Sequence, residues 1–276
     1  MEKTVLASRK ASQKIRFSVQ IIFFVLIALT ALNSYLESIG IVIPLVSQAS
    51  LHSLCPFGGV VTIYTLATTG RMVQKVHESS LVLLGLVGIL SVLFGPVFCS
   101  WMCPLGSIQE WIGKIGRKIF KNRYNHFVPA KIERYLKWFR YVVLVWVIYV
   151  TAQSGQLLFA NVDPYYALFN FWSGEVAIQA IIVLGLTLAG ALFIERPWCK
   201  FACPLGALLG LTNLFRIFRV RRTKSTCISC KKCDKACPMN IEVSDSSIVR
   251  DLSCNSCLRC TSDNVCPVPD TVNLKH

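Results

Sequence analysis

Long apolar stretches alternate with polar connections along the first two thirds of the chain. Each approaches the length that a helix needs to cross about 30 Å of hydrocarbon, and none carries a charged residue in its central part. The four stretches are residues 15–35, 80–98, 138–152 and 176–194. A chain of 276 residues could not cover four such helices on all sides. The pattern therefore predicts an all-α membrane protein with four transmembrane helices.

Composition and charge favour a membrane protein, and the family resemblance described below implies a prokaryotic cytoplasmic (inner) membrane. Hydrophobic residues make up 54% of the chain and charged residues only 16%, against about 25% charged in soluble domains. Of the 29 Lys and Arg residues, 27 lie in the N-terminal tail, the connection between the second and third stretches, and the region after the fourth. The positive-inside rule then predicts that both termini are cytoplasmic. The net charge of +15 favours membrane lipid headgroups over nucleic acid as its counterpart, and the first stretch is expected to be retained rather than cleaved as a signal.

Two short motifs resemble each other, and each follows an even-numbered apolar stretch. Residues 95–106 read GPVFCSWMCPLG, and residues 196–206 read RPWCKFACPLG. A helix-like amphipathic stretch follows each motif, at 107–120 and 207–220. We therefore expect two copies of a two-helix unit in parallel orientation.

The repeated motifs carry four cysteines at the predicted cytoplasmic edge of the membrane. Pro104 and Pro204 suit the first position of a helix, so Cys103 and Cys203 are expected at helix N-caps, where the dipole favours a thiolate. The complete set is Cys99, Cys103, Cys199 and Cys203. Four thiolates can hold one [4Fe–4S] cluster or one Zn²⁺ ion. Four small buried residues in tight turns, or a docking point for a partner, are the alternative, and the sequence leaves both open.

Eight further cysteines lie in the last 50 residues, in two runs that each end in Cys-Pro. The first run has the spacing C-x2-C-x2-C-x3-C-P, which is typical of bacterial two-cluster ferredoxins. The second run differs only in a last gap of five residues. Zinc sites more often show paired C-x2-C units with a longer spacer, and disulfides are rare on a reducing, cytoplasmic face. Two [4Fe–4S] clusters are therefore predicted.

In such runs the fourth cysteine binds the other cluster. The first cluster is expected on Cys227, Cys230, Cys233 and Cys266. The second cluster is expected on Cys254, Cys257, Cys260 and Cys237. These assignments divide the chain into a transmembrane domain, 1–222, and a small two-cluster ferredoxin-like domain, 223–276.

With these motifs, the chain resembles the membrane-bound ferredoxin-type quinol dehydrogenases of the NapH kind and the polyferredoxin membrane half of the NosR kind. The shared features are four spans, two Cys-x3-Cys-Pro motifs and a C-terminal two-cluster domain, which together cover essentially the whole chain. The chain differs in having Cys55-Pro-Phe-Gly-Gly in its first outward loop and in lacking the large extracytoplasmic flavin domain of the NosR kind. For Cys55, a buried small residue, a covalent attachment point and a ligand shared with a partner remain open.

The resemblance implies an electron-transfer subunit that exchanges electrons between the quinone pool and other redox subunits of a respiratory complex. Whether this makes it an oxidoreductase in its own right is left open, and no catalytic residue is identified. The alternatives are a redox or assembly factor for another metalloenzyme, and a membrane anchor that wires a cytoplasmic dehydrogenase into a complex. Residues that could bond a quinone carbonyl, or merely anchor the chain at the membrane interface, are His52, Tyr64, Asp163, Tyr165 and Tyr166.

Overall fold

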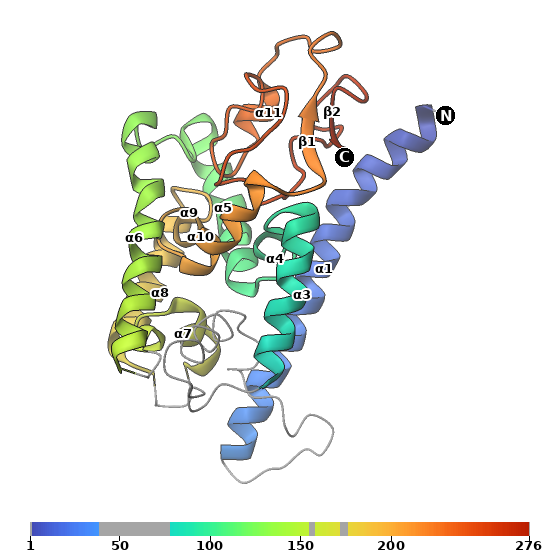
Figure 1. Cartoon of the computed structure of the whole chain (residues 1–276). Helices are drawn as coiled ribbons and strands as arrows, with labels where there is room; N and C mark the ends of the chain where they lie inside the picture. The colour runs from blue at the N-terminus through green and yellow to red at the C-terminus, as the bar shows by residue number, and fades with distance from the viewer. Residues whose placement is uncertain (1, 39–77, 155–157, 172–175, 276) are drawn as a thin grey trace.

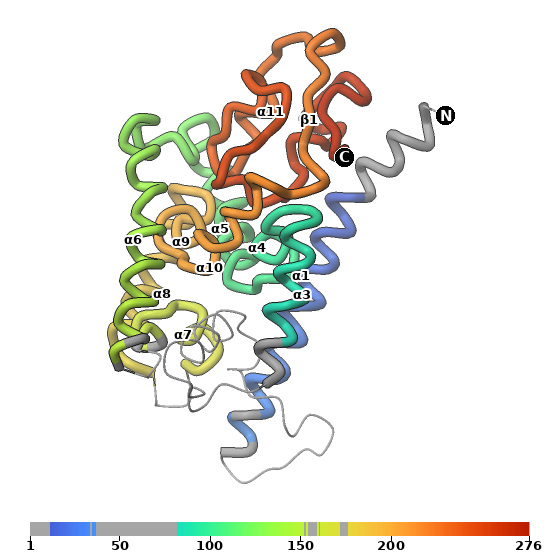
Figure 2. Tube along the Cα trace, in the orientation of Figure 1, coloured from blue at the N-terminus to red at the C-terminus, as the bar shows by residue number. Residues whose placement is uncertain are grey.

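The computed structural model describes residues 2–38, 78–154, 158–171 and 176–275, and most of them are helical. Helices form the larger part of the molecule, and the C-terminal residues form a smaller part at one end (Figure 1). The first helix, α1 (Glu2–Ser38), runs from beside the C-terminal part to the far end of the helical part (Figure 2). His52, Cys55 and Tyr64 lie outside the described residues.

The four predicted spans are helical to different lengths. In α1, the window Ser12–Asn33 is both apolar and long enough to cross a membrane, because 22 residues at about 1.5 Å each exceed the hydrocarbon thickness. The other three stretches lie in α3 (Glu78–Phe94), α6 (Ala130–Ser154) and α8 (Ile178–Ala191). Within the described ranges only α1 meets both conditions, since the apolar parts of α3 and α8 are shorter.

A short helix, α7 (Pro164–Asn170), fills the loop predicted to face outward between the third and fourth stretches. It follows η3 (Leu158–Asn161) and begins at Asp163, whose carboxylate accepts a hydrogen bond from the Tyr165 amide at 3.0 Å. Ala167 and Phe169 are buried against α1, α5 and α8. Helix α7 therefore packs into the helical part.

Each repeated motif forms a short helix, a tight turn and a second helix. The first motif gives α4 (Val97–Trp101) and α5 (Pro104–Phe120), after which η2 (Lys121–Arg123) ends the helix. The second motif gives α9 (Pro197–Phe201) and α10 (Pro204–Leu211). Pro104 and Pro204 stand at the first helical position as predicted, and extended Cys103 and Cys203 are the N-caps.

The prediction of an amphipathic helix over 207–220 is wrong. The apolar helix α10 ends at Leu211, η4 (Thr212–Leu214) follows, and the chain then enters strand β1 (Arg219–Arg222). This strand pairs antiparallel with β2 (Val272–Lys275), with Arg219 opposite Lys275 and Arg222 opposite Val272. Pairing with the end of the chain, which a local pattern does not reveal, decides the conformation here.

The C-terminal part has few regular elements besides the β1–β2 pair and α11 (Lys232–Lys235). Its small buried core contains Val220, Met239, Ile241, Val243 and Val249 together with several cysteines. Its strand β1 comes before residue 223, the predicted start of the second domain.

Candidate metal centres

The tail cysteines line two small cavities, four to each. One cavity is lined by Cys227, Cys230, Cys233 and Cys266, and the other by Cys237, Cys254, Cys257 and Cys260. Each cavity thus takes three thiols from one run and the fourth from the other. These are the sets that the sequence predicts for crossed ligation, while the ligand assignment itself stays a prediction. We call them the outer set and the inner set.

The two cysteine runs adopt the same backbone conformation at matching positions. Ser229 and Ser256, which precede the second cysteine of each run, both have φ near +53°. Lys231 and Leu258, which follow that cysteine, have φ of 52° and 54°. Left-handed conformations are unfavourable for residues with a Cβ and persist only where the surroundings fix them. Their repetition indicates two equivalent loops that wrap the two cavities.

The outer and inner sets differ in exposure. Cys230 of the outer set is exposed, and a hydrogen bond from Arg222 lowers the pKa of Cys227. In the inner set, burial and the neighbouring Cys257 raise the pKa of Cys237 to about 12. Burial likewise raises the pKa of Cys260 well above its usual value. Cys237 and Cys260 therefore stay protonated unless a bound cation stabilises their thiolates.

The inner set faces the helical part of the molecule. Asn213 donates to the carbonyl oxygen of Cys254 at 2.8 Å, and the Arg216 guanidinium lies 3.7 Å from its Sγ. From α1, Gln13 donates to the carbonyl oxygen of Cys257 at 3.2 Å. The cysteine run is thus held by polar side chains from two separate segments of the helical part.

The structure brings the four cysteines of the repeated motifs together, and we call them the edge set. Burial raises the pKa of Cys99 to about 12, and the negative charge of a neighbouring Cys199 thiolate raises it as well. Burial and the nearby Cys199 and Cys99 raise the pKa of both Cys103 and Cys203 well above the usual value. The N-cap position therefore does not make these thiols acidic, contrary to the sequence expectation, because desolvation outweighs the helix dipole. No disulfide joins any of the twelve described cysteines.

Close packing around the edge set depends on glycine. A Cβ at Gly106 would lie 2.8 Å from the carbonyl oxygen of Cys99, a separation that packed atoms do not reach. At the matching Gly206, a Cβ would lie 3.5 Å from the carbonyl oxygen of Cys199, which is an ordinary contact. The two motifs are thus alike in sequence, but only the second leaves room for a Cβ atom at its last glycine.

A buried ionic network centred on Glu110 joins four segments of the chain. Arg16 of α1 lies 2.6 Å from this carboxylate, and Arg259 of the second cysteine run lies 2.7 Å away. Arg196, just before α9, pairs with the same group, and Gln20 donates to it at 3.2 Å. Burial opposes ionisation of Glu110, but the three arginines hold its pKa well below the usual value. This network was not predicted from the sequence, although Arg16 and Gln20 are polar residues spaced by one helical turn in an apolar helix.

The network reaches the edge set through backbone and sulfur contacts. Arg196 donates to the carbonyl oxygen of Cys99 at 2.6 Å. The Gln109 side chain donates to Cys199 Sγ at 3.8 Å and accepts from the Trp198 amide at 3.2 Å. Residues of one motif therefore support the cysteines of the other.

A second polar network ties α6 and α9 to the C-terminal part. Buried Lys200 lies 2.9 Å from Glu133, which also accepts from Asn240 at 2.7 Å. Asn240 follows Cys237 of the inner set by three residues. The C-terminal part is therefore attached to the helices at two separate points, the Glu110 network and the Glu133 network.

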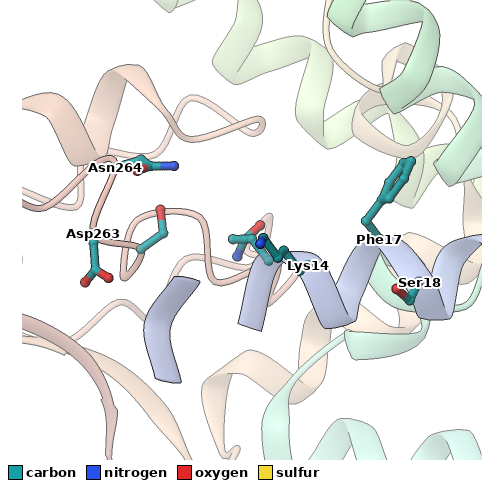
Figure 3. A pocket seen from close by; sticks show the side chains of 7 residues that line it. Lys14, Phe17, Ser18, Asp263 and Asn264 are labelled. Atoms are coloured by element: carbon teal, nitrogen blue, oxygen red, sulfur yellow. The ribbon is translucent and has the colours of Figure 1, made fainter. Parts of the chain in front are cut away.

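The longer last gap of the second run helps to form an open cavity of about 450 Å³ beside α1 (Figure 3). Its lining is Gln13, Lys14, Phe17 and Ser18 from α1, and Ser262, Asp263 and Asn264 from that gap. It contains no cysteine, so we assign no cluster to it.

Of the residues suggested for quinone, the structure describes Asp163, Tyr165 and Tyr166. Burial raises the pKa of Asp163 to about 7. Tyr165 packs against the same buried group of side chains as Cys103 of the edge set. Tyr165 therefore shares a buried cluster with Cys103, which the sequence alone did not indicate.

Comparisons with known proteins agree with this picture. A sequence family described as a 4Fe-4S binding domain matches the chain twice, at residues 76–123 and 176–224. Both matches contain edge cysteines and neither contains a tail cysteine. No solved structure matches the chain.

The related proteins match different shares of the chain. The putative electron transport protein YccM of Escherichia coli is 28% identical over 96% of this chain and 74% of its own length. The ferredoxin-type protein NapH of the same organism is 31% identical over 46% of this chain and 42% of its own length. The regulatory protein NosR of Stutzerimonas stutzeri is 27% identical over 43% of this chain and 16% of its own length. The expected resemblance is confirmed: the chain has two matches to a 4Fe-4S binding domain and is related to YccM, to the ferredoxin-type protein NapH and to NosR.

Proposed function

We propose that the protein exchanges electrons between quinone in a membrane and a redox partner, through iron–sulfur clusters at the edge, inner and outer sets. The observation that carries the proposal is the grouping of twelve cysteines into three sets of four, two of which lie on either side of one buried ionic network. The order along the molecule is edge, inner, outer. The inner set contacts the helical part, and the outer set has the exposed Cys230.

The donor atoms in each set fit a [4Fe–4S] cluster. Four thiols are the complete ligand set of such a cluster, which supplies one-electron steps when bound. In the inner and outer sets, the cavity between the thiols suits a cubane, whose iron and sulfide lie between its ligands. Zn²⁺ instead draws four thiolates to about 2.3 Å from a single point. No group of three or more His, Cys, Asp or Glu side chains in the described ranges is arranged to hold a single metal ion.

Charge around the edge and inner sets supports an anionic group there. Arg16, Arg196 and Arg259 are largely buried against Glu110 and Glu195, so the arginines outnumber the glutamates. Uncompensated buried charge is costly. A cluster held by four thiolates would balance the extra positive charge, and Arg196 and Gln109 would donate hydrogen bonds beside it.

Exposed apolar stripes on four helices support a multi-pass arrangement. Side chains at helical spacing on α1, α3, α6 and α8 are each more than half exposed. They are Ile15, Ile22, Leu26, Leu29, Val82, Leu86, Ile89, Val142, Val145, Tyr149, Ile178, Ile182 and Leu186. Patches of this extent mark contact with lipid or another protein. We infer a two-unit, four-helix membrane part whose shorter helices thin the bilayer locally.

The basic residues support an orientation with both chain ends in the cytoplasm. The cytoplasmic side would hold 27 Lys and Arg residues, and the outward side only two, Arg71 and Lys75. In this orientation all three cysteine sets lie toward the cytoplasmic side of the membrane.

For the quinone, we infer a position beside α7. Asp163, with its pKa near 7, is suited to accept a proton from a quinol, and Tyr165 is suited to hydrogen-bond a quinone oxygen. Tyr165 packs against the same buried cluster as Cys103, which would connect this position with the edge set.

The test is a reduction experiment on the full chain, purified anaerobically in lipid nanodiscs. Adding a reduced short-chain quinol should reduce iron–sulfur clusters, seen by EPR and by loss of visible absorption. A Cys103→Ser variant that keeps its tail clusters should lose this reduction. Clusters that dithionite reduces but no quinol reduces would contradict quinone exchange, and would favour an assembly factor or an anchor.

A further inference from the structure

The outer set lies beneath a strongly basic surface, which we call the basic cap. It consists of the exposed residues Arg221, Lys224, Ile228, Cys230, Lys231, Lys232 and Lys235. Between residues 219 and 235 the chain has seven basic residues and a single acidic one, Asp234. The carboxylate of Asp234 is occupied, since it accepts from both the amide (2.8 Å) and the hydroxyl of Ser244. Asp245, next to Ser244, is the adjoining exposed acidic residue.

The middle of the basic cap is apolar and lies over the outer cavity. Ile228 lines that cavity and is still 63% exposed. Cys230 and Lys231 line it as well and are also exposed. A protein that covered Ile228 would come close to an outer cluster without any rearrangement of the chain.

The basic cap lies at the opposite end of the molecule from α7 and from the apolar parts of α3 and α8 (Figure 1). Its charges therefore lie away from the apolar stripes of α3 and α8 that we assign to lipid. Positive charge at this distance from the bilayer is better placed to bind a soluble molecule than to bind anionic lipid headgroups.

We propose that the basic cap is the docking surface for a small, soluble, acidic redox protein whose own cofactor lies near its surface. This inference rests on the proposed outer cluster. Opposite charges steer such encounters and fix their orientation. Weak electron-transfer contacts bury less than about 1,200 Å² in total, so one apolar contact within a charged rim is sufficient.

The experiment measures binding, with two acidic probes: a flavodoxin and a [2Fe–2S] ferredoxin. The full chain is held in phosphatidylcholine nanodiscs, whose lipid has no net charge. At least one probe should bind at low salt, and raising the salt from about 20 to about 200 mM should weaken binding about tenfold or more. The double variant Lys231→Glu/Lys232→Glu should weaken low-salt binding by at least about tenfold. The matched control Lys131→Glu/Arg134→Glu makes the same charge change on exposed residues of α6 and should stay within about twofold.

Three results would overturn the proposal: no binding of either probe at low salt, equal losses in the two double variants, or cap variants that change binding only to phosphatidylserine vesicles. The last result would assign the surface to a membrane. Iron is measured in the same samples, so the two proposals can fail separately. A chain without tail iron would contradict the proposed function, whereas a chain with full iron and no probe binding would contradict only the docking surface.

Discussion

Arg259, which stands between Cys257 and Cys260 in the sequence, lies 2.7 Å from the Glu110 carboxylate on α5. Helix α5 itself begins directly after Cys103. One ion pair therefore connects a cysteine run of the C-terminal part to the helix that carries the edge motif. It fixes how the two parts sit against each other, and hence the spacing of the inner and edge sets.

Replacing Glu110 by Gln should destabilise the protein strongly. The variant leaves Arg16, Arg196 and Arg259 buried without their shared counter-charge, and breaking a buried ionic network costs about 3–5 kcal/mol. Thermal unfolding of the purified protein measures the effect. The control Lys118→Gln, exposed on the same helix, should change the free energy of unfolding by less than about 0.5 kcal/mol. Equal unfolding temperatures for the two variants would show that the network has no structural role.

The crossed ligation of the tail predicts which cysteine variants resemble each other. Cys233→Ser and Cys266→Ser should remove the same EPR signal, because both thiols line the outer cavity. Cys237→Ser should instead group with Cys254→Ser at the inner cavity. If Cys233→Ser and Cys237→Ser removed one signal together, each run would hold its own cluster and the crossed assignment would be wrong.

The two motif glycines should respond differently to a methyl group. Gly106→Ala places its Cβ against the backbone of Cys99, and such overpacking costs about 1–3 kcal/mol. Gly206→Ala has room, and alanine is the better helix former by about 1 kcal/mol, so its stability should stay the same or rise. Unfolding temperature and iron content should both fall only for Gly106→Ala. Equal behaviour would mean that the contact with Cys99 relaxes freely.

Quinol oxidation should depend on pH through Asp163. Burial raises the pKa of this carboxyl to about 7, so it can accept a proton above that pH but not below it. The rate of cluster reduction by quinol should rise as the pH increases through about 7, and Asp163→Asn should remove this rise while Asp163→Glu keeps most of it.

The stability of the fold should depend on pH through the same residue. Because the pKa of Asp163 in the folded chain is raised above the unfolded value of about 3.9, ionisation of the buried group costs stability as the pH rises from about 4 to about 7. Asp163→Asn should therefore stabilise the fold more at pH 8 than at pH 4, and an unchanged pH–rate profile would remove Asp163 from the reaction.

Much of this architecture could be predicted because cysteine and proline impose local rules. Cysteine spacing identified the two tail sets that line the two cavities, and Pro104 and Pro204 marked the starts of α5 and α10. The helix expected over 207–220 failed because β1 pairs with a strand 50 residues later. The Glu110 network was invisible because its members come from segments that meet only in the fold. The left-handed Ser229 and Ser256 gave no sequence signal, since glycine is the residue that usually marks this conformation.

Iron and sulfide content per chain tests the central claim most directly. Three sets of four thiols predict about twelve iron atoms in the full chain after anaerobic purification, and about eight in a folded Cys103→Ser variant. About eight iron atoms in the wild-type chain, with Cys99, Cys103, Cys199 and Cys203 all open to alkylation after unfolding in the absence of reductant, would contradict the claim. The edge set would then be packing residues, and no cluster would connect the membrane part with the tail.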